Sequence, residues 1–136
     1  IPYERERIFQ EGLLAGLRGD FLIAAHLLIP QIENSLRTLL GASGKPVTTI
    51  DPSDGTEMYL NLGTLLQSND IIALLSGELV MEMQSLLLEK TSWNGRNRLC
   101  HGLMDDKEFG GTEAFYAWWL VFRLCMKFRM ISQAKL

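Results

Sequence analysis

The sequence predicts an all-α fold, a bundle of four to five main helices with extra short helices. Two observations favour it: apolar residues recur at helical spacing in several segments, and no stretch alternates apolar and polar residues as a strand does. The length of 136 residues fits a single domain spanning residues 1–136. A chain of that size buries enough surface to fold without disulfides or metal ions.

The first two helices are expected over Tyr3–Leu17 and Phe21–Leu40. Asp20 precedes the second helix as a good N-cap, because its side chain can accept a hydrogen bond from the first turn. Pro30 lies inside the second helix and has no backbone donor. The pattern therefore predicts a kink at Pro30, or a junction between two helical segments.

Residues 42–56 contain two Pro, two Gly and many short polar residues, which is typical of a loop. The remaining helices are expected, in chain order, over Thr56–Leu66, Asp70–Leu75, Glu78–Lys90, Arg96–Leu103 and Glu113–Gln133. The last of these is apolar almost all round, with only a narrow polar strip. Such a helix usually lies at the centre of a bundle or in an oligomer interface.

Charge is spread unevenly along a chain whose net charge is −3. Residues 1–92 carry 6 Lys and Arg against 12 Asp and Glu, whereas residues 93–136 carry 7 against 4. This balance excludes a chain that is basic throughout, as a nucleic-acid coat would be. The positive C-terminal third favours an anionic partner in that part of the molecule.

Cysteine use and hydropathy indicate a cytoplasmic domain without membrane insertion. Cys100 and Cys125 lie in helix-like apolar sequence, which favours reduced thiols over a disulfide. No run of apolar residues reaches the roughly 18 to 20 that a membrane helix requires. The chain opens on Ile1 and leads directly into charged sequence. We therefore expect the C-terminal part of a longer protein, with partner domains elsewhere in that chain.

One short segment contains the candidate catalytic residues, Arg96, Asn97 and His101. On a helix, Asn97 and His101 are four residues apart and project from the same face. Arg96 is offset by about 100° and can reach round with its long side chain. An imidazole moves protons near neutral pH, and a guanidinium grips phosphate oxygens. An amide can orient either group, so the trio is suited to a phosphodiester.

The spacing of Arg96, Asn97 and His101 resembles the Arg-x(4–6)-His signature, often with Asn after the Arg, of the HEPN superfamily (higher eukaryotes and prokaryotes nucleotide-binding). A wider resemblance is to an uncharacterised domain family of larger bacterial proteins, which also occurs in the endoplasmic reticulum membrane-associated RNA degradation protein. That resemblance extends over nearly the whole chain and rests on Glu6–Leu13, Gly19–Phe21, His26–Asn34, Arg96–Leu103 and Ala117–Trp119.

The resemblance implies an all-helical, metal-independent endoribonuclease that needs no cofactor. The 2′-hydroxyl of RNA would attack the adjacent phosphate and give a 2′,3′-cyclic phosphate and a 5′-hydroxyl. His101 would be the general base or acid, Arg96 would stabilise the phosphate, and Asn97 would position one of them. The resemblance also implies a homodimer with a composite active cleft.

Four further residues are candidates for supporting roles or for RNA binding: Glu33, Arg98, His26 and Trp93. Glu33 lies four residues before Arg37, and if it is buried it can pair with Arg96 and fix its direction. Arg98 contacts either phosphate or only solvent. His26 is a candidate second base, although a hydrogen-bonded core histidine is the stronger interpretation.

The three tryptophans can either pack in the core or stack on RNA bases. Trp118 and Trp119 are expected to pack in the core. Trp93 lies in a polar turn beside the motif and is the better candidate for stacking.

Three other interpretations stay open. Arg96, Asn97 and His101 can form a structural polar network at the start of a helix. The chain can be a non-catalytic dimerisation module, or a nucleotide- or RNA-binding module, of a larger protein. It can also be a toxin-like domain that its parent chain or a partner holds inactive.

Overall fold

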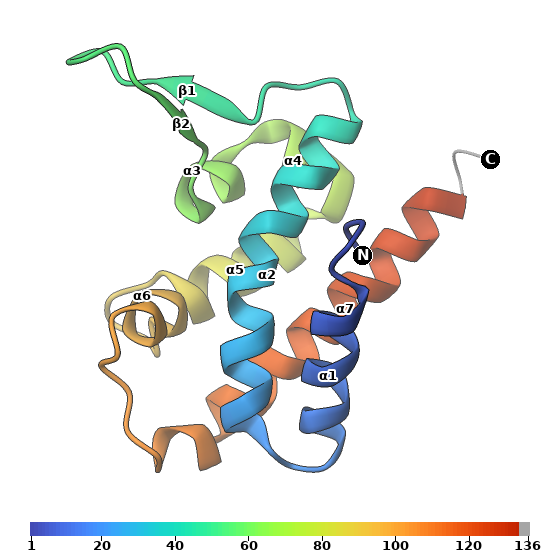
Figure 1. Ribbon diagram of the computed structural model, residues 1–136, viewed down its shortest axis with the longest axis vertical. Helices are drawn as coiled ribbons and strands as arrows, with labels where there is room; N and C mark the ends of the chain where they lie inside the picture. Colours follow the sequence, from blue (N-terminus) through green and yellow to red (C-terminus); the bar gives the residue numbers. More distant parts are fainter. Residues whose placement is uncertain (134–136) are drawn as a thin grey trace.

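The computed structural model describes residues 1–133, and these form a mainly helical domain with one small hairpin (Figure 1). The all-α helical bundle predicted from the sequence is confirmed. In chain order the elements are α1 (Glu6–Leu17), α2 (Phe21–Ala42), β1 (Thr48–Ile50), β2 (Glu57–Tyr59), α3 (Leu62–Gln67), α4 (Asn69–Leu75), α5 (Gly77–Leu87), α6 (Gly95–Cys100), the 3-10 turn η1 (Glu108–Gly110) and α7 (Thr112–Gln133).

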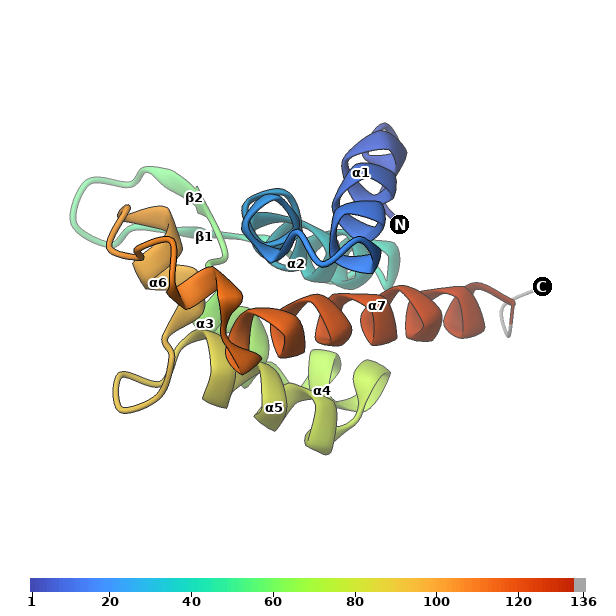
Figure 2. The ribbon, with the colours of Figure 1, turned by 90° about the horizontal axis from the view of Figure 1, so that it is seen from below.

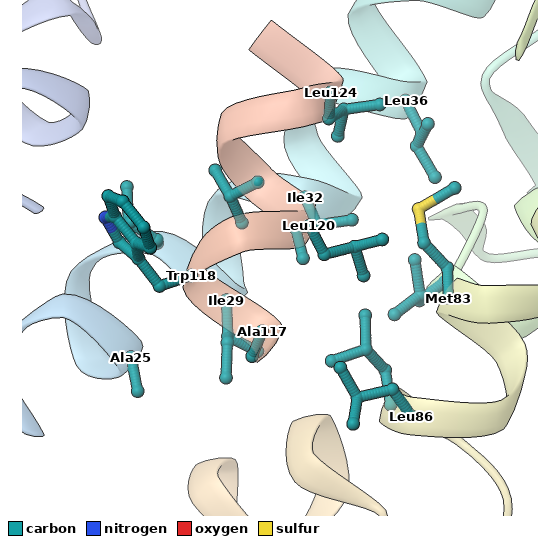
Figure 3. Close-up of a cluster of buried hydrophobic side chains, with 14 of the residues drawn as sticks. Ala25, Ile29, Ile32, Leu36, Met83, Leu86, Ala117, Trp118, Leu120 and Leu124 are labelled. Atoms are coloured by element: carbon teal, nitrogen blue, oxygen red, sulfur yellow. The ribbon is translucent and has the colours of Figure 1, made fainter. Parts of the chain in front are cut away.

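The last helix, α7, is the central element of the bundle. It runs between α1 and α2 on one side and α4 and α5 on the other (Figure 2). Its buried face meets apolar side chains of α2 and α5 in one continuous core (Figure 3). The fully buried members of this core shown in Figure 3 include Ile29, Ile32, Leu36, Met83, Leu120 and Leu124.

The second helix is continuous from Phe21 to Ala42 and includes Pro30. The predicted junction between two segments is therefore wrong. Asp20 caps the helix as expected, since its carboxylate accepts a hydrogen bond from the backbone N–H of Ile23 at 3.0 Å. Pro30 lies on the exposed side, while its neighbour Ile29 is buried. Burial of the opposite face keeps the helix intact despite the missing backbone donor.

The hairpin of β1 and β2 corrects the expectation of a plain loop and of a helix starting at Thr56. The strands pair antiparallel, with Thr48 opposite Tyr59 and Ile50 opposite Glu57. Almost every residue of the ladder is exposed. The strands therefore lack the alternation between a buried and a solvent face that makes a strand recognisable in sequence.

Two other predicted helices end earlier than expected. The helix predicted to reach Lys90 ends at Leu87, and the helix predicted over Arg96–Leu103 ends at Cys100. Gly102 adopts a positive φ of 64°, which a helix cannot continue through.

The exposed surface of α7 corrects the expectation that Trp119 packs in the core. Trp118 is only 9% exposed, as predicted, but Trp119 is 40% exposed. Its ring stacks on the ring of Phe122, with 5.5 Å between the centroids. The two residues belong to a line of exposed apolar side chains, which we call the α7 stripe: Phe115, Trp119, Phe122, Met126 and Met130.

Both cysteines are free thiols, as predicted, and burial raises the pKa of the Cys125 thiol. Among residues 1–133, none of the helices combines the length and the apolar character that a membrane span requires. Within the same residues, no three His, Cys, Asp or Glu side chains are grouped so that they could hold a metal ion.

Candidate functional site

The short helix α6 carries the motif and is fixed to the bundle by its apolar side. Asn94 precedes it in the left-handed conformation, with φ 52°, which asparagine tolerates better than most residues. Gly95 and Leu99, four residues apart, are both buried. The intervening Arg96 and Asn97 are therefore turned toward partly exposed surface.

Trp93 packs against the start of α6 and is not available to stack on RNA. Its side chain is 8% exposed. A Cβ atom at Gly95 would lie 2.3 Å from the Trp93 ring, so the indole covers the backbone directly. The predicted stacking role of Trp93 is therefore wrong, because the ring is used to hold α6.

Arg96 forms the predicted ion pair with Glu33. Its Nη2 atom donates to Glu33 Oε2 at 3.1 Å, and the Glu33 side chain is only 16% exposed. The other carboxylate oxygen, Oε1, accepts from Arg37 Nη2 at 2.8 Å. One carboxylate of α2 therefore orients two guanidinium groups, one from its own helix and one from α6.

Asn97 and Asn94 extend this arrangement along α6. Asn97 Oδ1 accepts from Arg96 Nη1 at 3.2 Å, and Asn97 Nδ2 donates to Asn94 Oδ1 at 2.9 Å. The Asn97 amide is thus bound to Arg96, whereas only the backbone connects it to His101. We call the connected side chains the Glu33 cluster: Glu33, Arg37, Asn94, Arg96 and Asn97.

The Glu33 cluster carries an uncompensated positive charge. It contains two guanidinium groups and one carboxylate, and all three side chains are partly buried. The buried Nε atom of Arg37 has no hydrogen-bond partner within the part of the chain that the structure describes. Charges in such surroundings interact more strongly than in water, so the cluster favours an anionic ligand.

His101 is exposed and caps the C-terminal end of α6. Its backbone N–H donates to the carbonyl of Asn97 at 3.1 Å, which preserves the helical turn between them. Across residues 1–133, no hydrogen bond to the His101 ring is present. The imidazole is accordingly accessible to a ligand that approaches the end of α6.

Arg98 pairs with Glu108 and with the backbone, so the expectation that it contacts only solvent is wrong, while its contact with phosphate stays a prediction. Its guanidinium donates two hydrogen bonds to Glu108, at 2.5 and 2.9 Å, and one to the carbonyl of Leu103 at 3.2 Å. The hydrogen bonds from Arg98 hold the pKa of the Glu108 carboxyl below its usual range. This pair closes the loop that follows His101 back onto α6.

His26 is hydrogen-bonded as expected, but it is exposed rather than in the core. Its Nδ1 atom lies 2.8 Å from the carbonyl oxygen of Leu22. Its ring lies 5.1 Å from that of Phe109, which follows Glu108 in η1. His26 precedes Glu33 by two helical turns, about 10 Å along α2.

Sequence reasoning missed several members of the site. The Asn94-Gly95 pair is a recognisable turn signal and could have placed Asn94 at the start of α6. Tyr59 of the hairpin lies over Arg37, with 5.4 Å from the guanidinium carbon to the ring centroid. No local sequence pattern predicted the contact of Tyr59 with Arg37 or the pairing of Arg98 with Glu108, because both depend on tertiary packing.

Comparison of the chain with models of known protein families, with curated protein sequences and with solved structures gave no match.

Proposed function

We propose that this domain is a metal-independent endoribonuclease of the HEPN type. The observation that carries the proposal is the ion pair of Arg96 with Glu33, because it fixes a guanidinium on the same short helix whose C-terminal end His101 caps. The guanidinium supplies a cation for a phosphate, and the exposed imidazole supplies a group for proton transfer.

The proposed reaction needs two proton transfers and stabilisation of an anionic transition state. The 2′ oxygen bonds to phosphorus while the bond from phosphorus to the 5′ oxygen breaks. His101 takes the proton from the 2′-hydroxyl or gives one to the departing 5′ oxygen. Arg96 binds the non-bridging oxygens, where charge develops. Asn97 contacts Arg96 and acts as a positioning residue.

A homodimer with a composite cleft is part of the proposal. Each chain offers one His101, whereas the reaction needs both a base and an acid. A second copy supplies the other proton-transfer group, and two-fold dimers are the commonest oligomers. The exposed α7 stripe offers an apolar surface on which a second copy can pack.

The experiment is cleavage of a panel of single-stranded RNAs in EDTA, with analysis of the product ends. Wild type is expected to leave 2′,3′-cyclic phosphates and 5′-hydroxyls, and Arg96→Ala and His101→Ala are expected to abolish cleavage. Arg7→Ala, at an exposed position of α1, is the matched control and should cleave normally. Absence of cleavage by a folded dimer would overturn the proposal, as would equal cleavage by all variants.

Mixed dimers test the composite cleft. A cleft that uses His101 of both chains is inactive in every dimer that contains one His101→Ala chain. After subunit exchange of wild type with an equal amount of His101→Ala, about a quarter of the dimers are wild type, so about half of the activity of wild type alone should remain. Unchanged activity after the exchange would exclude this form of the cleft.

A binding module without catalysis is the second candidate. It is favoured by the hydrogen bonds of Arg96, whose Nη atoms already contact Glu33 and Asn97. On this proposal the Glu33 cluster holds a nucleotide or RNA phosphate without cutting it. Binding of RNA by wild type, with no products after prolonged incubation, would select this candidate.

A further inference from the structure

We infer that Tyr59 and Arg37 form a stacking site for one nucleobase of a single-stranded RNA. This inference rests on the RNA-directed function proposed above, and it concerns a position that neither the motif nor α6 contains. Tyr59 ends β2 and is 71% exposed. The guanidinium carbon of Arg37 lies 5.4 Å from the centroid of its ring.

The arrangement of the ring suits it to stacking. A cation placed over an aromatic ring is attracted to the face of that ring, so Arg37 limits the freedom of an otherwise exposed side chain. Arginine and tyrosine are both side chains on which unstacked RNA bases pack. A base that packs on the Tyr59 ring joins an existing cation–π contact, and such stacking tolerates any base because each has a π-face.

The stacking pair connects directly to the proposed catalytic cation. Arg37 Nη2 bonds to Glu33 Oε1 at 2.8 Å, and Glu33 Oε2 bonds to Arg96 at 3.1 Å. One guanidinium and one carboxylate therefore separate the Tyr59 ring from Arg96. An RNA strand with a phosphate at Arg96 can place a nearby base on Tyr59, a role that the buried Trp93 cannot fill.

Negative charge on the hairpin limits how far a bound RNA strand can extend along it. The turn beyond the ladder contains Asp51 and Asp54, and hydrogen bonds from Ser53 and Thr56 hold the pKa of each carboxyl below its usual range. Both are therefore charged at neutral pH and repel phosphates. One end of the bound RNA should therefore lie near Tyr59, and the rest of the RNA should run toward α6. The hairpin then binds one base and not a longer stretch of RNA.

Binding of a fluorescein-labelled, single-stranded RNA hexamer by the non-cleaving His101→Ala protein tests the inference. In that background, Tyr59→Ala and Tyr59→Leu should each weaken binding about tenfold, because stacking is lost. Tyr59→Phe keeps the ring and should bind within about twofold of the parent. Tyr3→Ala removes a tyrosine that is 85% exposed elsewhere, and it should have no effect.

The salt dependence of binding separates stacking from charge. Tyr59→Leu should leave unchanged the slope of the logarithm of the binding constant against the logarithm of the salt concentration, since no phosphate contact is lost. Arg96→Ala should make this slope shallower, because it removes a phosphate contact. Circular dichroism and the unfolding temperature of each variant confirm that the fold is retained. The Leu variant keeps an apolar side chain on β2, so it covers the case in which Ala disturbs the hairpin.

The outcomes distinguish this inference from the proposed function. Unchanged affinity in both Tyr59→Ala and Tyr59→Leu, or no binding of RNA by the parent, overturns it. A loss in Tyr59→Phe as large as in Tyr59→Ala also overturns it, since the hydroxyl would then be responsible. If wild type cleaves RNA while the Tyr59 variants bind normally, only the stacking site is wrong. If wild type cleaves nothing but affinity depends on the Tyr59 ring, only the proposed cleavage is wrong.

Discussion

Glu33 Oε2 and Arg96 Nη2 lie 3.1 Å apart, although 63 positions separate the two residues in the sequence. The contact joins α2 to α6 and gives the guanidinium of Arg96 a fixed direction. Because the same carboxylate also binds Arg37, it keeps two partly buried positive charges next to each other. The positions of both cations therefore depend on a single side chain.

Glu33→Gln is expected to lower stability and to impair the proposed cleavage. The amide cannot balance two guanidinium groups, so their repulsion should reduce the free energy of unfolding by about 1–2 kcal/mol. Arg96 should lose its orientation, and the cleavage rate should fall at least tenfold while RNA still binds. Urea unfolding and single-turnover kinetics measure the two effects. Glu78→Gln, at an exposed position of α5, is the control, and equal behaviour of the two variants would contradict the prediction.

The sequence was informative where burial follows a local period. Glu33 lies beside the apolar face of its helix, four residues before Arg37, and this position already predicted its pairing with Arg37 and with Arg96. The helices and the cap at Asp20 follow from the same kind of local pattern. The structure leaves the chemical roles of Arg96, Asn97 and His101 as predictions.

The sequence was uninformative where side chains meet through tertiary packing. Trp93 lies among polar residues, and only the fold shows that its ring covers Gly95. Arg98 pairs with Glu108, ten residues further along the chain. A loop lies between them, so helical spacing could not predict the pair. Trp119 follows a buried neighbour on an apolar helix, and only the fold shows that its side chain is 40% exposed.

Gly16→Ala should destabilise the contact of α1 with α7. A Cβ atom at Gly16 would lie 2.2 Å from the ring of Trp118, and that indole is fixed by a hydrogen bond to the carbonyl of Leu13 at 3.2 Å. Such overpacking costs about 1–3 kcal/mol. Urea unfolding measures the loss, and the near-ultraviolet circular dichroism of the tryptophans should change with it.

Gly77→Ala is the matched control for Gly16→Ala. Gly77 begins α5, and no atom lies within 4 Å of the position of an added Cβ. The substitution restricts the unfolded chain without a clash and should raise the free energy of unfolding by about 0.4–1 kcal/mol. If both variants lost stability equally, close packing at Gly16 would not be the cause.

The pH dependence of stability should reveal the cluster of Glu82, Tyr116 and Arg123. Glu82 accepts from the Tyr116 hydroxyl at 2.6 Å and from Arg123 at 2.5 Å, and the hydrogen bond from Arg123 lowers the pKa of Glu82. A carboxyl whose pKa is lower in the folded state stabilises it above its unfolded pKa of about 4.3. That contribution disappears as the pH falls through the folded pKa.

Glu82→Gln should therefore lower the urea midpoint at pH 7, and the difference from wild type should shrink toward pH 3. On the alkaline side, the hydrogen bond to Glu82 raises the pKa of Tyr116. The contribution of the Tyr116 hydroxyl to the free energy of unfolding is present below the ordinary tyrosine pKa of about 10 and is lost as the pH rises through the folded pKa. Glu11→Gln, at an exposed position of α1, should show no such dependence. A constant difference between Glu82→Gln and wild type across the acid range would refute the coupling.

Substitution of the α7 stripe should convert the proposed homodimer into monomers. The stripe extends over about 22 Å of helix from Phe115 to Met130, and its side chains are 37–63% exposed in the single chain. Trp119→Glu or Met126→Glu places a carboxylate in the middle of the apolar surface. A second copy that packs there would have to bury that unpaired charge, which is strongly unfavourable.

Analytical ultracentrifugation measures the effect. Wild type is expected at twice the 15.4 kDa mass of the chain, and both variants at that mass. Met81→Glu is the matched control, because Met81 is 63% exposed on α5 and lies outside the stripe. A wild type that stays monomeric at high concentration would contradict the proposed dimer. Stripe variants that stay dimeric would show that the dimer interface lies on another face. Because the α7 stripe is separate from the Glu33 cluster, monomeric variants that still bind RNA but no longer cleave it would show that the cleft needs two chains.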